Sequence, residues 1–164
     1  MPKVISFIGH HNSGKTTLLS QIITILLERG YRVGAVKHAP HLEEMDSPDG
    51  DSARLHDAGA EQTLLVSHDT CSLFWDRDPD EPIDRLIERL FADYDLVLVE
   101  GYKHGPFPKI EVYRSLGTRA DPLAGEVEVI AVVTKEKVAL PDGVKVLSPR
   151  NPEGVADFIE ERFL

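Results

Sequence analysis

A glycine-framed turn near the start of the chain constrains its fold more than any other feature. An apolar run from Val4 to Ile8 leads directly into GHHNSGKTT at residues 9–17, which fits the pattern G-x-x-x-x-G-K-[ST]. In such a loop several backbone N–H groups point at one spot, and the N-terminus of the following helix adds about half a positive charge there. The pattern predicts a β-strand, a phosphate-binding loop and an α-helix in succession. The predicted nucleotide-binding residues are Gly9, His10, His11, Asn12, Ser13, Gly14, Lys15, Thr16 and Thr17.

Polar side chains at the loop and at other strand ends are predicted to act on the phosphates and on a bridging Mg²⁺ ion. Lys15 is expected to lie along the β- and γ-phosphates, and the Thr16 hydroxyl to ligate the metal. Glu100 ends an aliphatic run and offers a hard oxygen ligand, with Asp51 as a further acid. Lys37 would reach the γ-phosphate from the side opposite Lys15. The alternative for Lys37 is a solvated surface position, and the alternative for Asp51 is a helix N-cap. The predicted catalytic residues are Lys15, Lys37 and Glu100, and the predicted metal ligands are Thr16, Asp51 and Glu100.

The rest of the chain alternates β-rich apolar runs with helical patterns, which is typical of an α/β fold with a mainly parallel sheet. We expect helices over 14–29, 51–59 and 82–91, and a closing helix capped by Asn151. We expect further strands over 31–37, 63–66, 71–75, 95–100, 109–113, 127–134 and 144–147. The predicted architecture is a P-loop NTPase fold, three-layer α/β/α, with an antiparallel hairpin extension from 63–66 and 71–75. At this length we expect a single nucleotide-binding domain over 1–164.

Charge and cysteine content limit the partners and the compartment. The sequence has 28 acidic and 18 basic residues and a net charge of −10, which argues against nucleic acid or an anionic membrane as the main partner. The single cysteine, Cys71, excludes an internal disulfide, and we expect it to pack within a strand. No apolar run approaches the roughly 18 residues of a membrane span, and no signal-like region follows Met1. These features predict a soluble, cytoplasmic protein.

The base of the nucleotide is less well specified than its phosphates. Residues 133–137, VTKEK, partly resemble the [NT]KxD guanine reader, but Lys137 replaces the aspartate that accepts hydrogen bonds from guanine N1–H and N2–H. Residues 148–151 are an alternative frame for the base. An arginine finger increases the rate of nucleotide hydrolysis by a factor of about 10³ to 10⁵. Arg54 and Arg119 are the candidates, and neither stands out by its position, so we expect slow intrinsic turnover.

Histidine is frequent in the predicted loops. Neutral imidazole ligates borderline metals such as nickel and zinc. The sequence has no C-x-x-C or H-E-x-x-H framework, so polar loop filling is the favoured interpretation and a metal cluster the alternative. The histidines in or beside loops are His10, His11, His38, His41, His68 and His104.

Four segments together resemble one known family. They are GHHNSGKTT at 9–17, VKHAPH at 36–41, DSARLHDAGA at 51–60 and LVLVEGYKHGPFPKIEV at 96–112. In this order they are similar to the molybdopterin-guanine dinucleotide biosynthesis protein B (MobB) family. The resemblance covers about the first two-thirds of the chain, and the C-terminal part adds little.

The resemblance implies a cytoplasmic homodimer that binds GTP, hydrolyses it weakly and assists the molybdopterin guanylyltransferase, which joins GMP to molybdopterin. Mg²⁺ is the implied metal, and other molybdenum cofactor enzymes are implied as further partners. Carried over, residues 9–17 would hold the nucleotide, and Asp51 and Glu100 would be the acids on the metal side. Because Lys137 replaces the acid of the guanine reader, the preference for GTP over ATP rests on the resemblance alone.

Two other classes of P-loop protein fit the same pattern. A nickel-type metallochaperone GTPase would use the loop histidines, and stoichiometric uptake of Ni²⁺ or Zn²⁺ would distinguish it. An ATP-dependent ligase of the dethiobiotin synthetase type would use a strand-end lysine such as Lys37 and an acid such as Glu100 in catalysis. Substrate-stimulated release of ADP would favour the ligase, and strict GTP selectivity would argue against it.

Overall fold

The computed structural model of the chain describes residues 1–38, 54–55, 57–76, 78, 80–115 and 121–164. Their contacts divide the chain into two compact units, one made of Met1–His38 with Ile87–Leu164 and the other of Ala39–Leu86. Within the predicted helix over 51–59, residues 54, 55 and 57 are helical and the Ala58 N–H donates to Arg54 O at 3.1 Å, while residues 51–53 and 56 lie outside the described residues. His41 and Arg119 also lie outside them.

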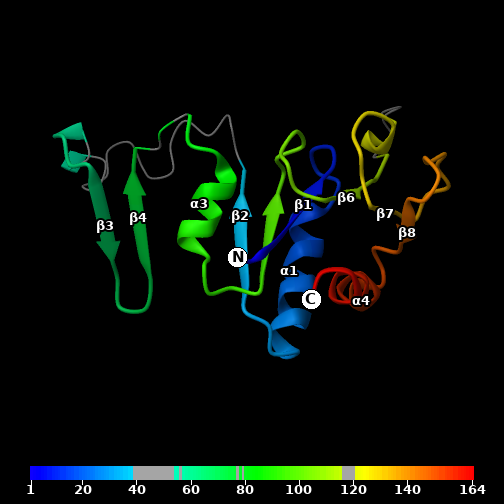
Figure 1. Ribbon diagram of the computed structural model, residues 1–164, viewed down its shortest axis with the longest axis horizontal. Coiled ribbons are helices and arrows are strands. Elements are labelled where there is room, and N and C mark those ends of the chain that lie inside the picture. Colours follow the sequence, from blue (N-terminus) through cyan, green and yellow to red (C-terminus); the bar gives the residue numbers. More distant parts are fainter. Residues whose placement is uncertain (39–53, 56, 77, 79, 116–120) are drawn as a thin grey trace. The chain divides into compact units, whose positions relative to one another are not determined.

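The first unit is built on a six-stranded sheet in which every pair of neighbouring strands is parallel. The order is β2-β5-β1-β6-β7-β8, so β1, which leads into the loop, lies between β5 and β6 (Figure 1). Because the strands are parallel, their carboxyl ends meet at one edge, and the loop at 9–17 follows β1 at that edge. This arrangement confirms the predicted mainly parallel sheet. The strands are β1 Lys3–Ile8, β2 Val33–Lys37, β5 Leu96–Glu100, β6 Lys109–Val112, β7 Ala131–Val133 and β8 Lys145–Leu147.

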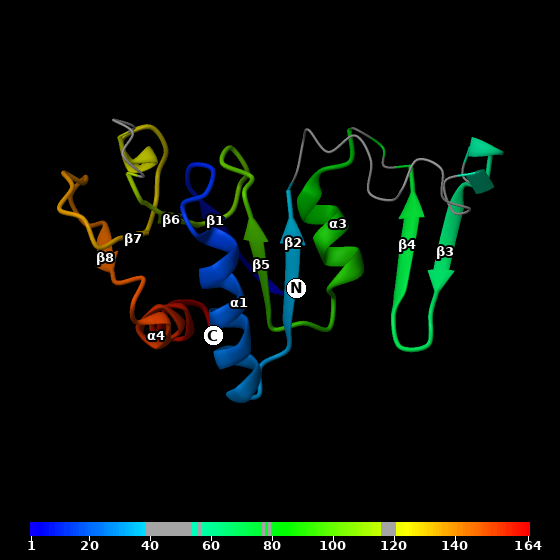
Figure 2. The same cartoon turned by 180° about the vertical axis from the view of Figure 1, so that it is seen from behind.

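Two helices, α1 (Lys15–Glu28) and α4 (Pro152–Phe163), lie side by side in the first unit (Figures 1 and 2). One apolar core joins them to the sheet, and this burial is the main stabilising term for the scaffold that carries the loop. As predicted, Asn151 caps α4, because its Oδ1 accepts a hydrogen bond from the Gly154 N–H at 3.0 Å. The side chains in this core with no exposed surface are Ile5, Phe7, Ile22, Leu26, Leu96, Ile110, Ala131, Val133, Val155, Ala156 and Ile159.

Two shorter helical segments complete the described elements. The helix α3 (Ile83–Leu90) begins in the second unit and ends in the first, and the 3₁₀ turn η1 (Leu123–Gly125) follows β6 in the chain. No helix among the described residues is long and apolar enough to cross a membrane.

The end of α1 explains why β2 begins later than the sequence predicts. Gly30 has φ 91° and its N–H donates to Leu27 O at 3.0 Å, while the Tyr31 N–H donates to Leu26 O at 3.1 Å. This is the Schellman pattern that closes a helix with a left-handed glycine. Tyr31 therefore belongs to the helix cap, and strand pairing starts only at Val33.

The predicted strand over 127–134 is shorter in the structure, where β7 covers only Ala131–Val133. The Val127 N–H donates to Leu123 O at 2.9 Å, which ties the start of the apolar run to η1. Val129 is buried in a small cluster with Leu123 and Val132. The run is thus apolar because it packs around η1, and only its second half pairs with neighbouring strands.

The second unit contains the predicted antiparallel hairpin. Strands β3 (Gln62–Val66) and β4 (Cys71–Trp75) pair antiparallel, with Gln62 opposite Trp75 and Val66 opposite Cys71. The expectation that Cys71 packs within its strand is wrong, since Cys71 is exposed. The physical reason is that the apolar composition of the hairpin does not reflect burial, because Leu64, Leu65, Val66 and Leu73 are exposed as well.

A polar network joins the end of α1 to α4 and makes stability depend on pH. The Tyr31 hydroxyl donates to Glu160 Oε1 at 2.7 Å, and Arg29 Nη1 lies 2.6 Å from Glu160 Oε2. These two contacts, Tyr31 first, lower the pKa of Glu160. A carboxyl group whose pKa is lowered by folding stabilises the folded state at pH values above its ordinary pKa. This contribution is lost as the pH falls through the lowered pKa. We expect Glu160→Gln to lose less stability than wild type as pH falls below about 4.5.

Urea unfolding midpoints between pH 7 and pH 3 measure this effect. The matched control is Glu161→Gln, which removes the same charge from an exposed neighbour in α4. Identical pH profiles for the two variants would contradict the assignment to Glu160.

Candidate nucleotide site at the carboxyl edge of the sheet

The loop from Gly9 to Gly14 fits tightly over the end of β6. Gly9 has φ 149°, and a Cβ atom there would lie 2.3 Å from Val112 O and 2.9 Å from Ser13 Oγ. Only glycine allows this approach, since the first contact is with a backbone atom. Within the loop, His11 and Asn12 are exposed, whereas Ser13 is buried. His10 Nε2 lies 3.1 Å from Asp121 O, which makes its ring a loop contact.

The first turn of α1 offers backbone N–H groups to an anion. The Leu18 N–H donates to Gly14 O at 3.0 Å, which is the first bond of the helical ladder. The N–H groups of Lys15, Thr16 and Thr17 come before that bond and have no acceptor four residues earlier within the helix. The positive end of the helix dipole lies at the same place. This geometry suits a phosphate group.

Lys15 is held inside the loop. Its Nζ donates to Gly9 O at 3.0 Å and to His10 O at 2.8 Å. Partial burial lowers the pKa of Lys15, and nearby Lys37 lowers it further, while Glu100 opposes both effects. The ammonium group is thus kept beside the helix N-terminus by carbonyl dipoles.

The pair formed by Thr16 and Glu100 is the second feature of the site. Thr16 Oγ1 donates to Glu100 Oε2 at 2.8 Å, because β5 pairs with β1 so that Glu100 lies opposite Phe7, just before the loop. Both side chains present hard oxygen atoms, which fits a Mg²⁺ ion that also keeps water and phosphate ligands. The structure therefore brings together two of the three predicted metal ligands, and Asp51 lies outside the described residues.

Lysine residues around Glu100 differ in what they contact. Lys37 lies opposite Glu100 in the pairing of β2 with β5, and its Nζ is 4.0 Å from Glu100 Oε1 with a side chain that is 69% exposed. It remains free to turn toward a ligand. Lys103, which follows Glu100 in the chain, forms an ion pair with Glu126 at 2.6 Å instead. The Lys103 ammonium lowers the pKa of Glu126.

The predicted alternative of a histidine metal cluster finds no support in the described part of the chain. Among those residues, no group of three or more His, Cys, Asp or Glu side chains could hold a metal ion. The ring of His38 packs against Tyr102 with centroids 4.7 Å apart. Polar and aromatic contacts thus account for His10 and His38, while His41 lies outside the described residues.

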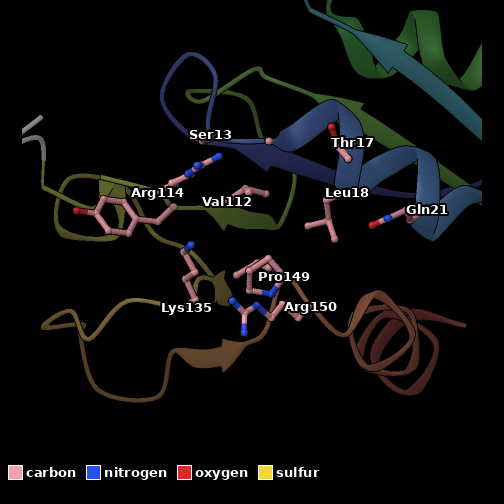
Figure 3. A pocket seen from close by; sticks show the side chains of 12 residues that line it. Ser13, Thr17, Leu18, Gln21, Val112, Arg114, Lys135, Pro149 and Arg150 are labelled. Atoms are coloured by element: carbon pink, nitrogen blue, oxygen red, sulfur yellow. The ribbon is translucent and has the colours of Figure 1, made fainter. Parts of the chain in front are cut away.

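A hollow of about 330 Å³ lies beside the loop, on the β6 side of β1 (Figure 3). Its volume is near the lower end of the range of about 300 to 1,000 Å³ that is usual for small-molecule sites. Loop and α1 residues form one wall, and the segments after β6, β7 and β8 form the other. It is lined by Ser13, Gly14, Thr17, Leu18, Gln21, Val112, Tyr113, Arg114, Val133, Lys135, Pro149 and Arg150.

Comparison with known sequences decides the family. Residues 4–135 match the family described as molybdopterin guanine dinucleotide synthesis protein B, or MobB. The chain belongs to the MobB family. The family resemblance expected from the sequence is thereby confirmed, and the match covers the loop, the Thr16–Glu100 pair and Lys135.

Curated relatives of this MobB chain match it along nearly its whole length. The molybdopterin-guanine dinucleotide biosynthesis adapter protein of Escherichia coli (strain K12) is 37% identical over 165 residues, covering 98% of this chain and 93% of the relative. The protein of the same name from Haemophilus influenzae is 34% identical over 158 residues, covering 96% and 87%.

Solved MobB structures share the fold. A crystal structure of molybdopterin-guanine biosynthesis protein B has a TM-score of 0.74 at 30% identity, covering 96% of this chain and 98% of the other. A crystal structure of Bacillus subtilis MobB has a TM-score of 0.74 at 25% identity, covering 99% and 98%.

The residues that line the hollow of this MobB chain fall into two groups, those that the sequence analysis predicts and those that it does not. Lys135 and Arg150 fall in segments already considered for the base, whereas Gln21, Tyr113 and Arg114 were not singled out. Arg114 follows β6 closely, so the rule that ligands lie at strand carboxyl ends would have found it. Gln21 offers no such signal, because an exposed polar residue on a helix is ordinary.

Proposed function

We propose that the protein binds GTP with Mg²⁺ at residues 9–17 and acts as an adapter in molybdopterin guanine dinucleotide biosynthesis, assisting the molybdopterin guanylyltransferase. The observation that carries this proposal is the Thr16–Glu100 hydrogen bond of 2.8 Å beside a lysine held in the loop. Family membership supplies the pathway, because relatives 32–37% identical to this chain are named as adapter proteins of that biosynthesis.

Each residue of the proposed site has a defined task. The first-turn amides of α1 and Lys15 bind and orient the β- and γ-phosphates. Thr16 and Glu100 hold Mg²⁺, with Asp51 proposed as a further acid, and the bound ion neutralises phosphate charge. Lys37 approaches the γ-phosphate from β2. We propose slow hydrolysis, because neither Arg54 nor Arg119 stands out by its position in the sequence as an arginine finger.

The hairpin supports the proposal of a homodimer. Leu64, Val66 and Leu73 share one face of the hairpin and are between 44% and 68% exposed, and clustered exposed apolar residues mark association surfaces. We propose that two copies of the chain associate.

Three further proposals concern the organisation and setting of the protein. We propose that residues 1–164 act as one nucleotide-binding domain and that the protein works in the cytoplasm. Further molybdenum cofactor enzymes are proposed as partners, and nucleic acid and membranes are not.

A nucleotide competition series tests the binding site. A fluorescent GTP analogue is displaced by GTP or ATP, each with and without Mg²⁺. We expect GTP to compete better than ATP, and Mg²⁺ to improve GTP affinity in wild type but hardly in Glu100→Gln, because that substitution removes the charged metal ligand. The exposed acid Glu28, at the far end of α1, gives the control Glu28→Gln. Failure of wild type to bind any nucleotide would refute the proposal.

A further inference from the structure

The cations around the hollow beside the loop carry a further inference, which rests on the proposed binding of GTP. Arg114, Lys135 and Arg150 enter the hollow from the segments after β6, β7 and β8 (Figure 3). All three are exposed, and within the described part of the chain none of their side chains forms an ion pair. Among the residues that the structure describes, no aspartate or glutamate lines the hollow. The site is therefore rich in hydrogen-bond donors and lacks a carboxylate acceptor.

The hollow is continuous with the phosphate site. Ser13, Gly14 and Thr17 belong to the loop and first turn of α1, and they also line the hollow. Ser13 is only 6% exposed, and its Oγ has no hydrogen-bond partner in the described protein. A buried hydroxyl without a partner is costly unless a ligand or water satisfies it. A nucleotide with its phosphates on the α1 amides would thus extend its nucleoside into this hollow.

The acids nearest to the hollow in the chain are already engaged. Glu136 Oε1 accepts a hydrogen bond from the Ser115 N–H at 3.0 Å. Glu111 has no exposed surface, and its two oxygens accept from the N–H groups of Leu123 and Ala124 at 2.7 and 2.9 Å. Neither carboxylate lines the hollow, and Lys137 stands at the acidic position of the usual guanine reader.

The turn after β8 presents the Arg150 side chain. The Arg150 N–H donates to Ser148 Oγ at 3.2 Å, and the Asn151 N–H donates to Ser148 O at 3.1 Å. Pro149 has no N–H, and the Asn151 side chain caps α4. The backbone donors of 149–151 are thus used within the turn. Of the residues in this turn, Arg150 is the one with a charged side chain that lines the hollow.

We propose that the protein recognises guanine through its acceptor edge, O6 and N7, by Arg150 with Lys135 beside it, and not through N1–H and N2–H by a carboxylate. Arginine is suited to bind O6 and N7 of guanine with two hydrogen bonds. Adenine presents an amino group in place of O6, and a cation that only donates cannot pair with it. The exocyclic N2 amine of guanine finds no acidic acceptor and does not contribute to selection.

Inosine triphosphate separates the two modes of recognition, because inosine keeps O6 and N7 and lacks the N2 amine. We expect ITP to bind wild type within about 2-fold of GTP, and both ATP and 7-deaza-GTP, which lacks N7, to bind about 10-fold more weakly or worse. Titration calorimetry with Mg²⁺ measures all four affinities. ITP binding 10-fold or more weakly than GTP would overturn the inference and leave the proposed GTP binding intact.

Substitution of Arg150 tests the residue assignment. We expect Arg150→Met to weaken GTP and ITP about 10-fold and ATP clearly less, because adenine shares only N7 with guanine, and so to remove most of the preference for GTP. The control is Lys137→Met, which removes the same charge from an exposed position outside the lining and should preserve the GTP to ATP ratio. A preserved ratio in Arg150→Met, with an unchanged melting temperature, would refute its role. If wild type binds no nucleotide, the proposed function falls together with this inference.

Discussion

Lys15→Ala is expected to weaken GTP binding by about 100-fold. Two charge-assisted contacts to phosphate oxygens, at about 1.5 kcal/mol or more each, correspond to about 3 kcal/mol. In the free protein, Lys15 Nζ donates to Gly9 O and His10 O, so the ammonium is positioned before the nucleotide arrives. An ammonium group has three N–H donors, so two phosphate contacts require Nζ to give up one of these carbonyl contacts. The exchange takes place within the loop, and we therefore expect most of the gain on binding to be lost on substitution.

Titration of Mg²⁺–GTP into wild type and Lys15→Ala measures this loss. The control is Lys3→Ala, which removes the same charge from an exposed residue at the start of β1, away from the carboxyl edge of the sheet. Both variants should keep the melting temperature within a few degrees, because neither side chain is in the core. Less than a 5-fold difference between Lys15→Ala and wild type would contradict the proposed site.

Gly9→Ala is expected to destabilise the fold and to disrupt the loop together. The added methyl group would lie 2.3 Å from Val112 O at a φ of 149°, so either β6 or the loop must shift. Steric overlap with backbone combined with an unfavourable dihedral angle costs about 3 kcal/mol or more. For a chain of this size, that corresponds to a melting temperature lower by about 6 to 12 °C. GTP binding should fall as well, since a shifted loop misplaces Lys15.

Differential scanning calorimetry of Gly9→Ala and Gly125→Ala provides the comparison. A Cβ atom at Gly125 would have no heavy atom within 4 Å, so the same chemical change there should be neutral or slightly stabilising. Equal melting temperatures for the two variants would contradict the expected destabilisation and would mean that the end of β6 can shift to accommodate the added methyl group at little cost.

The strand-loop-helix around residues 9–17 could be predicted because one local pattern fixes it. Glu100 and Lys37 could be predicted to approach each other, because both end parallel strands that share a sheet edge. The length of β7 could not, since apolar composition reports burial and does not distinguish strand pairing from packing around η1. The same limit explains Cys71, whose apolar neighbours are exposed.

The base side of the site was harder to foresee than the phosphate side. Glu111 is a charged residue with no exposed surface, and only the fold shows that two backbone N–H groups bind its carboxylate. Arg114 could be assigned to the carboxyl edge of the sheet because it follows β6, but only the fold shows that it shares one hollow with Lys135 and Arg150. Such convergence depends on strand order, which the sequence pattern does not specify.

The central place of β1 in the sheet has a consequence for evolution and engineering. Thr16, Glu100 and Lys37 lie toward β5 and β2, whereas Lys135 and Arg150 lie toward β7 and β8. The proposed roles therefore place chemistry at the triphosphate and choice of nucleobase on opposite flanks of a single strand. Substitutions on one flank should be able to accumulate without disturbing the other, so selectivity for a new nucleobase could be introduced while the metal-dependent half stays intact.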